Sequence, residues 1–182
     1  MENSTVILDI KKELRASMNG ILSARMREAG APYKLVFGVE LPRLQSIANE
    51  FQPSRQLAQE LWNENIRECK LLATMLMPPQ DFLPEMADIW VDEIPTAEVA
   101  QVLCMHLLSK EPWCAVVAFE WIASPSPMRQ LCGFLCIARL LQQGAQLQER
   151  SAYELKDQAQ SLLPTADFHL RKAIIAATSL LE

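Results

Sequence analysis

The sequence contains little that would build a β-sheet. Only five of the 182 residues are glycine, and runs of β-branched residues are short and isolated. Leucine, alanine, glutamate, glutamine and methionine dominate instead, and these residues favour helices. Half of the residues are hydrophobic and 21% are charged, a balance typical of a folded chain and not of a disordered one. The composition therefore predicts an all-α protein.

The sequence also lacks segments that direct a chain to or through a membrane. Residues 1–14 have no basic start followed by a long apolar run, which is the pattern of a signal peptide. Apolar runs elsewhere are interrupted by charged or polar residues well before the roughly 18 residues that a transmembrane helix needs. We therefore expect no membrane partner.

The cysteine pattern does not predict disulfide bonds. Five cysteines, an odd number, lie within apolar patterns that resemble core positions, and we interpret them as reduced thiols of a cytoplasmic protein. Cys132 and Cys136 share a helix face, and His106 follows Cys104 by two residues. Structural zinc requires a denser set of ligands than this. We therefore expect neither a metal nor another cofactor.

An excess of positive charge is missing as well. The formal net charge is −5 at pH 7, with 17 lysines and arginines against 22 aspartates and glutamates. Binding of nucleic-acid phosphates depends on clustered lysine and arginine, so this balance argues against a large nucleic-acid surface. It leaves room for one basic concave face on an otherwise acidic body.

The clearest helical pattern is a pair of helices in residues 111–143. Residues 113–123 are apolar on almost all sides, which predicts a helix that is buried on most of its surface. Two prolines then end this helix, and Ser126 and Pro127 suit the N-cap and the first position of the next one. Such a hairpin cannot bury both of its apolar faces alone, so it needs similar hairpins stacked beside it.

Similar patterns fill the rest of the chain. Turn signals such as Pro78-Pro79 recur roughly every 15 to 20 residues, so a pair of helices takes about 35 to 40 residues, close to the HEAT and armadillo period. We predict a single HEAT-like α-solenoid domain over residues 1–182, with about ten helices in pairs. Its N-terminal helices occupy 1–30 and its stacked pairs 41–182. A compact irregular bundle is the alternative.

Four stretches, in matching order and spacing, resemble one known family. Residues 33–48, YKLVFGVELPRLQSIA, resemble a GV…P.LR.IA pattern, and Leu61-Trp62, Arg67-Glu68 and Leu72-Ala73 resemble the hairpin that follows it there. EWIAS at 120–124 is similar to a KWIAS helix end, and DFHLRKAI at 167–174 to an EFFIQKAI stretch. The family is that of the AlkD-like DNA alkylation repair glycosylases. The resemblance covers nearly the whole chain and implies a HEAT-like solenoid with DNA in its concave cleft.

The family's activity, which the resemblance brings with it, is excision of cationic alkylated purines such as 3-methyladenine and 7-methylguanine. Departure of the base leaves positive charge on the sugar, and a nearby carboxylate stabilises that charge. Aromatic rings favour a cationic sugar and base through their negative faces. Arginine and lysine bind the phosphates. An active member is therefore expected to carry an acid, cleft aromatics and cations.

The catalytic segment of this sequence departs from the family pattern. When Trp90 is aligned with the tryptophan before the family's WWD.VD segment, Gln101 falls on the catalytic aspartate, and Thr96 and Ala97 fall on the aromatic pair. Glutamine is neutral and cannot supply the field of a carboxylate. Glu98 lies one turn before Gln101 on the same helix face and is the candidate replacement acid. The alternative is a solvated glutamate that the helix N-terminus stabilises.

Two further departures follow the later matches. Gln130 is kept after EWIAS, but Leu131 falls on the family's DNA-contacting arginine. Ile175 and Ala176 occupy the region of a second cleft aromatic. Each of these changes removes charge or aromatic surface. Together with Gln101, they predict that the glycosylase chemistry has degenerated.

Basic residues are scattered along the sequence. If the chain curves as the family does, four of them lie along the concave rim, and with one amide they are the predicted DNA contacts: Lys34, Arg43, Arg129, Gln130 and Lys172. The alternative is that these charges only solubilise the surface.

The sequence supports three hypotheses and leaves open whether the chain is an enzyme. The first is a DNA alkylation repair family protein with degenerate glycosylase chemistry that still binds double-stranded, structured or damaged DNA. The second is an active N-glycosylase for alkylated purines that uses Glu98 as its acid. The third, motivated by the acidic balance, is a protein-binding scaffold with no nucleic-acid role.

Overall fold

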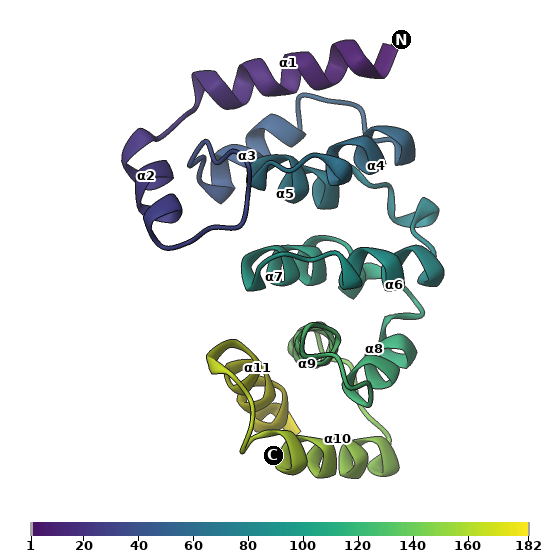
Figure 1. The fold of residues 1–182 in the computed structure, drawn as a ribbon. Helices are drawn as coiled ribbons and strands as arrows, with labels where there is room; N and C mark the ends of the chain where they lie inside the picture. Colours follow the sequence, from purple (N-terminus) through teal and green to yellow (C-terminus); the bar gives the residue numbers. More distant parts are fainter. Residues whose placement is uncertain (1, 182) are drawn as a thin grey trace. The chain divides into compact units, whose positions relative to one another are not determined.

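A computed structural model describes residues 2–181, which form eleven α-helices and three short 3-10 helices (Figure 1). Within these residues the β-type pairing is an isolated bridge between Leu35 and Ile66. The predicted all-α class is therefore confirmed, with eleven helices where about ten were expected. The chain divides into two compact units, unit 1 (Met1–Phe82) and unit 2 (Leu83–Glu182).

Unit 1 contains the first five helices. Their bounds are α1 Glu2–Ala16, α2 Gly20–Glu28, α3 Leu41–Ala48, α4 Arg55–Asn63 and α5 Arg67–Leu76, and the 3-10 helix η1 Pro79–Asp81 follows. Helix α5 packs against both α3 and α4, and α1 packs against α4. Trp62, Leu61 and Leu72 are completely buried between these helices because their apolar faces meet there.

Polar side chains cap the start of two of these helices. The Asn19 side chain accepts a hydrogen bond from the Leu22 backbone N–H at 3.0 Å and begins α2. The Ser54 hydroxyl accepts one from the Leu57 N–H at 3.1 Å and begins α4. Such caps satisfy amide groups that have no partner inside the helix.

Unit 2 contains the remaining helices. Their bounds are α6 Pro84–Asp92, α7 Ala97–His106, η2 Leu108–Lys110, α8 Cys114–Ile122, α9 Pro127–Gln142, α10 Glu149–Leu162, α11 Phe168–Thr178 and η3 Ser179–Leu181. Helix α9 is at the centre of this unit, because α6, α7, α8 and α11 all pack against it. Its completely buried side chains include Cys132, Phe134 and Ile137.

The hairpin of α8 and α9 forms as the sequence predicts. The Ser126 hydroxyl accepts a hydrogen bond from the Arg129 N–H at 3.4 Å, and Pro127 is the first residue of α9. Gly133 then allows α9 to approach α8 closely. A Cβ atom at this position would lie 2.6 Å from both the Ala118 carbonyl oxygen and the Ile122 Cγ1 atom.

The structure also bears on disulfide bonds, membrane spans and metal sites. All five cysteines are free and buried. Burial, as the main cause, raises the pKa of Cys69 to about 12, so its thiol stays protonated at neutral pH. The part of the chain that the structure describes has no helix long and apolar enough to cross a membrane. Nor does that part hold three or more histidine, cysteine or acidic side chains grouped so that they could ligate a metal.

Candidate nucleic-acid interface

Gln101 lines a hollow of about 220 Å³ in unit 2, which we call the α7–α9–α11 hollow. Helix α7 contributes Gln101, and α11 contributes Ala176. Helix α9 contributes Arg139 and Gln142. The structure thus brings to one hollow Gln101 and Ala176, which we predicted from the sequence to fall at the family's acid position and in its second aromatic region. None of the described residues that line it is acidic, and Arg139 is the one charged group among them.

The Arg139 guanidinium was not predicted as a site residue, and its surroundings are unusual. Its Nε atom is buried, and within residues 2–181 the side chain makes neither a hydrogen bond nor an ion pair. Its charge nevertheless acts on a neighbour. Burial, then the charges of Lys110 and Arg139, lower the pKa of His106. The sequence could not reveal the buried Nε atom of Arg139, because burial of one atom depends on the tertiary packing.

Other departures gather at a second hollow of unit 2, of about 160 Å³. Thr96 and Ala97, at the positions of the family's aromatic pair, line it together with Leu131, at the position of the arginine. His169 and Met128 also line it. The Thr96 hydroxyl accepts a hydrogen bond from the Val99 N–H at 3.5 Å, so this residue serves as the N-cap of α7. In the predicted alignment, a capping residue and apolar side chains take the places of cleft groups here, and Asp167 also lines the hollow.

Glu98, the candidate replacement acid, lies in the first turn of α7. Its side chain is half-buried, and it does not line the α7–α9–α11 hollow. Its place in the first turn fits the stabilisation of a negative charge by the helix N-terminus. The exposed Gln101 lies one turn further along the helix.

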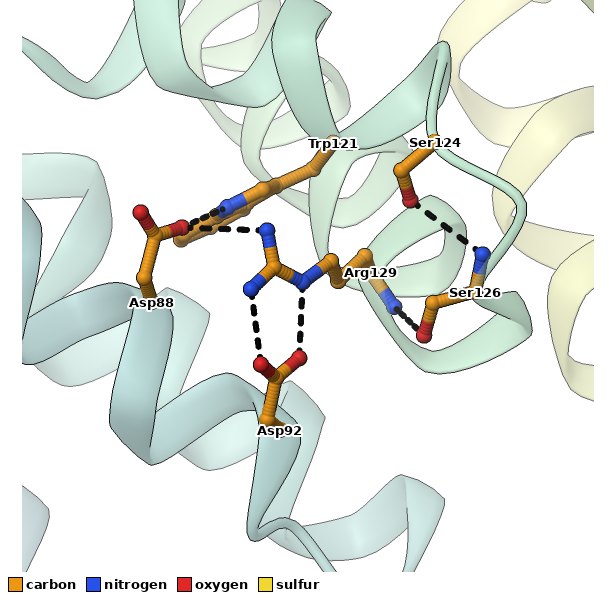
Figure 2. A network of polar contacts seen from close by, with 6 residues as sticks. All are labelled: Asp88, Asp92, Trp121, Ser124, Ser126 and Arg129. Atoms are coloured by element: carbon orange, nitrogen blue, oxygen red, sulfur yellow. Dashed lines mark hydrogen bonds and ion pairs between the residues drawn. The ribbon is translucent and has the colours of Figure 1, made fainter.

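Arg129, a predicted DNA contact, is part of a polar network with α6 (Figure 2). Its Nε and Nη2 atoms donate to the two carboxylate oxygens of Asp92, both at 2.7 Å. Its Nη1 donates to Asp88 at 3.4 Å, and the Trp121 Nε1 atom donates to the same Asp88 oxygen at 2.7 Å. The hydrogen bond from Arg129 is the main cause that lowers the pKa of Asp92. Two carboxylates therefore face one guanidinium, and the network carries a net negative charge.

Gln130 and Lys172 differ in their exposure. Gln130 is buried, and its Nε2 atom donates to the Ser124 carbonyl oxygen at 2.7 Å, which stabilises the turn between α8 and α9. Lys172 on α11 is exposed and makes no ion pair within the described residues. A cation of this kind can contact a phosphate without first giving up another partner.

The two predicted contacts in unit 1 are both exposed and differ in their ion pairs. Arg43 on α3 donates to Ser17 at 2.8 Å and forms ion pairs with Glu13 at 3.2 Å and Glu50 at 3.6 Å. Lys34 is exposed and has no ion-pair partner in the part of the chain that the structure describes. Arg43 therefore fastens α3 to α1, whereas the charge of Lys34 is available.

Lys34 belongs to a basic hollow of about 390 Å³ within unit 1. Lys11 and Arg15, one turn apart on α1, line it as well. Lys11 pairs with Glu64 at 2.8 Å, while Arg15 makes no ion pair within residues 2–181. Arg15 was not predicted as a site residue. The spacing of Lys11 and Arg15 along one helix face is the signal that could have found it.

A buried ion pair at the start of α5 organises residues 36–39 of unit 1. Glu68 is completely buried and accepts hydrogen bonds from three backbone amides: Phe37 at 3.1 Å, Gly38 at 2.9 Å and Val39 at 3.3 Å. Arg67 donates from Nη1 to Glu68 at 2.7 Å and to the Val39 carbonyl oxygen at 2.9 Å. Two of the matched sequence stretches, 33–48 and Arg67-Glu68, therefore occur together for a structural reason.

Comparisons with known proteins agree with this fold. A family model described as "DNA alkylation repair enzyme" matches residues 10–177. The chain is also similar to a solved structure described as "a new family of proteins related to the HEAT-like repeat DNA glycosylases with affinity for branched DNA structures". The TM-score is 0.82 and the identity 19%, over 95% of this chain and 74% of that chain. No match is found among curated proteins. At this identity the structural likeness shows the fold, which confirms the predicted HEAT-like class.

Proposed function

Because the chain belongs to the DNA alkylation repair enzyme family, we propose that it binds DNA on a HEAT-like scaffold without excising bases. Excision creates positive charge on the sugar, and an enzyme lowers that barrier with a carboxylate aimed at the place where the charge develops. Gln101 stands where the family's aspartate is expected. An amide can orient water, but it has no net charge to stabilise the cation.

The observation that carries this proposal is the charge of the α7–α9–α11 hollow. Arg139 supplies a positive charge there, and the described residues that line the hollow include no acid. A cation beside a developing cation raises its energy, most strongly where protein excludes water. This arrangement disfavours base excision and favours the binding of an anion, and each DNA phosphate is an anion.

Structured DNA is the ligand class that we favour. The solved structure with the same fold comes from proteins described as having affinity for branched DNA. Lys34 and Lys172, which have no ion-pair partners within residues 2–181, are the proposed first contacts to phosphates. Arg43 and Arg129 are proposed contacts that must exchange their carboxylate partners for phosphate. Gln130 acts by holding the turn at Ser124.

The test is a binding and release experiment on the purified protein. Fluorescence anisotropy would compare a four-way junction with a linear duplex of the same length, between about 50 and 200 mM salt. We expect tighter binding of the junction, weakened by salt, and no release of 7-methylguanine or 3-methyladenine from methylated DNA. Lys34→Gln and Lys172→Gln should each weaken binding. Arg150→Gln, which removes an exposed cation on α10 and lowers the net charge by the same one unit, serves as the control for altered net charge.

Two outcomes would support the other hypotheses. Base release that is lost in Glu98→Gln while DNA binding persists would establish an active glycosylase with a relocated acid. Absence of salt-dependent DNA binding would leave the protein-binding scaffold as the remaining hypothesis. Binding without release, unchanged by Glu98→Gln, would support the proposal.

A further inference from the structure

We propose that the α7–α9–α11 hollow is an oxyanion subsite in which Arg139 binds one phosphate group of the DNA. This inference rests on the proposed DNA binding and adds a specific contact that neither the family pattern nor the exposed Lys34 and Lys172 indicate. The juxtaposition that carries it is a guanidinium without a partner beside two side-chain amides, Gln101 and Gln142, in one cavity.

The state of Arg139 calls for a ligand. Buried polar groups in folded proteins are almost always hydrogen-bonded, because an unpaired buried donor costs free energy. The buried Arg67 follows that rule, because it donates to Glu68 and to the Val39 carbonyl oxygen. Arg139 is half-buried with a buried Nε atom, and no such bond is formed within residues 2–181. A bound anion would contact the Nη groups at the hollow and give this guanidinium the charge partner that it lacks among the described residues.

The lining of the hollow selects an oxyanion. A guanidinium presents several N–H groups in one plane, which match two oxygens of a phosphate. Gln101 and Gln142 can each donate an amide N–H to further oxygens. Among the described lining residues no carboxylate competes for the cation or repels an anion. Cys104, Met105 and Leu135 make the remaining wall largely apolar, which strengthens the attraction between opposite charges.

The exposure of these residues favours a phosphate that is attached to a polymer. Gln101 and Gln142 are exposed, whereas Arg139 is half-buried and its Nε atom is inaccessible. A phosphate can therefore meet the amides first and then approach the guanidinium, while the rest of its chain stays outside. The volume of about 220 Å³ leaves room for one phosphate group.

The first arm of the test measures DNA binding by variants of Arg139. Arg139→Gln should weaken binding of the four-way junction about tenfold, as expected for loss of one charge-assisted hydrogen-bonded contact. The slope of log K against log salt should become less steep by about 0.9, the contribution of one phosphate. Arg139→Lys should recover part of the affinity. Arg150→Gln is the matched control, because Arg150 is exposed on α10, carries the same charge and lies outside the hollow.

The second arm identifies the source of the anion. The Arg139 Nε–H signal in a ¹H–¹⁵N spectrum, assigned by its loss in Arg139→Gln, would be followed during titration with the junction and, separately, with inorganic phosphate. We expect the junction to shift this signal at concentrations that saturate binding, with inorganic phosphate acting only at much higher concentration. Saturation by dilute inorganic phosphate, with junction binding equal in Arg139→Gln and the wild type, would assign the hollow to a free anion and overturn the inference.

The two proposals fail in different ways. If the wild type binds the junction but Arg139→Gln and Arg150→Gln bind it with the same affinity and salt slope, the subsite is wrong and DNA binding stands. If the wild type does not bind DNA, the proposed function itself is wrong, and the subsite falls with it. Circular dichroism and thermal unfolding of Arg139→Gln confirm that the variant is folded before either result is interpreted.

Discussion

Two arginines, one in each unit, occupy opposite situations. Arg67 in unit 1 is 4% exposed, pairs with Glu68 and also donates to the Val39 carbonyl oxygen. Arg139 in unit 2 has a buried Nε atom and, within the described residues, no hydrogen bond or ion pair. The Arg67 guanidinium uses these hydrogen bonds to hold parts of the fold together. The Arg139 guanidinium keeps its hydrogen-bonding capacity, which is how a group that binds a ligand is expected to look in the free protein.

Arg67 therefore holds the fold together, whereas Arg139 is available to bind a ligand. The Arg67–Glu68 pair connects α5 to residues 36–39 and leaves little for a DNA molecule to bind. The motif that first suggests a DNA repair family is therefore mostly structural at this point. The hollow around Gln101 and Arg139 looks unremarkable in sequence, yet it has the charge and the unsatisfied donor that a phosphate requires.

The largest expected effect comes from breaking the satisfied pair. Glu68→Gln leaves the Arg67 charge buried without its anion, so we expect a loss of about 3–5 kcal/mol in the free energy of unfolding, measured with urea. The double variant Arg67→Met with Glu68→Gln removes both charges, keeps a side-chain oxygen for the backbone N–H groups of residues 37–39 and should cost less than the single change. A double variant that is less stable than Glu68→Gln would mean that the pair itself stabilises the unit.

A smaller loss is expected at the backbone that Glu68 holds. Gly38 has a φ of +75°, and a Cβ atom there would lie 2.5 Å from the Asn19 carbonyl oxygen and 2.6 Å from the Ser23 nitrogen. Gly38→Ala should therefore cost about 1–3 kcal/mol, from both the left-handed backbone and the close contacts. Gly144→Ala is the control, because its φ is also positive, at +92°, but nothing lies within 4 Å. Equal losses in the two variants would show that the contacts at Gly38 do not matter.

The sequence predicted the helices better than it predicted the candidate site, and the reason is physical. Prolines and caps act locally, so the break at Pro78-Pro79 and the start of α9 at Ser126 could be located from neighbouring residues alone. The partners of Arg129 on α6 lie 37 and 41 residues away, and no local pattern announces them. The buried Nε atom of Arg139 likewise depends on how α7, α9 and α11 pack. The roles of Gln101 and Glu98 stay predictions.

Replacement of Arg139 should affect the free energy of unfolding in the opposite direction to disruption of the Arg67–Glu68 pair. A structural arginine would destabilise the protein when replaced, but Arg139→Met should raise the free energy of unfolding by about 1 kcal/mol, since it removes an unsatisfied donor and keeps an apolar stem of similar length. The same variant should bind the four-way junction more weakly than the wild type. Urea unfolding and anisotropy measured on one preparation would show both effects. A clear loss of stability in Arg139→Met would place Arg139 with Arg67 among the residues that hold the fold.

The smallest effect is expected at His106, whose pKa the charge of Arg139 helps to lower. Burial, then Lys110 and Arg139, hold the pKa of His106 below its ordinary value of 6.5, so the unfolded chain takes up a proton more readily than the folded one. Stability from this residue is therefore complete above about pH 6.5 and is lost as the pH falls through the folded pKa.

Arg139→Gln should raise the pKa of His106 in an NMR titration and make the loss of stability on acidification smaller. A phosphate bound at Arg139 should also raise the pKa of His106. Arg150→Gln should leave the titration of His106 as it is in the wild type, because the residues that perturb His106 do not include Arg150. If the pKa of His106 is the same with and without the Arg139 charge, solvent screens the guanidinium. The hollow would then lack the positive electrostatic field that is expected of an unpaired arginine, in contrast to Arg67, whose charge is neutralised by Glu68.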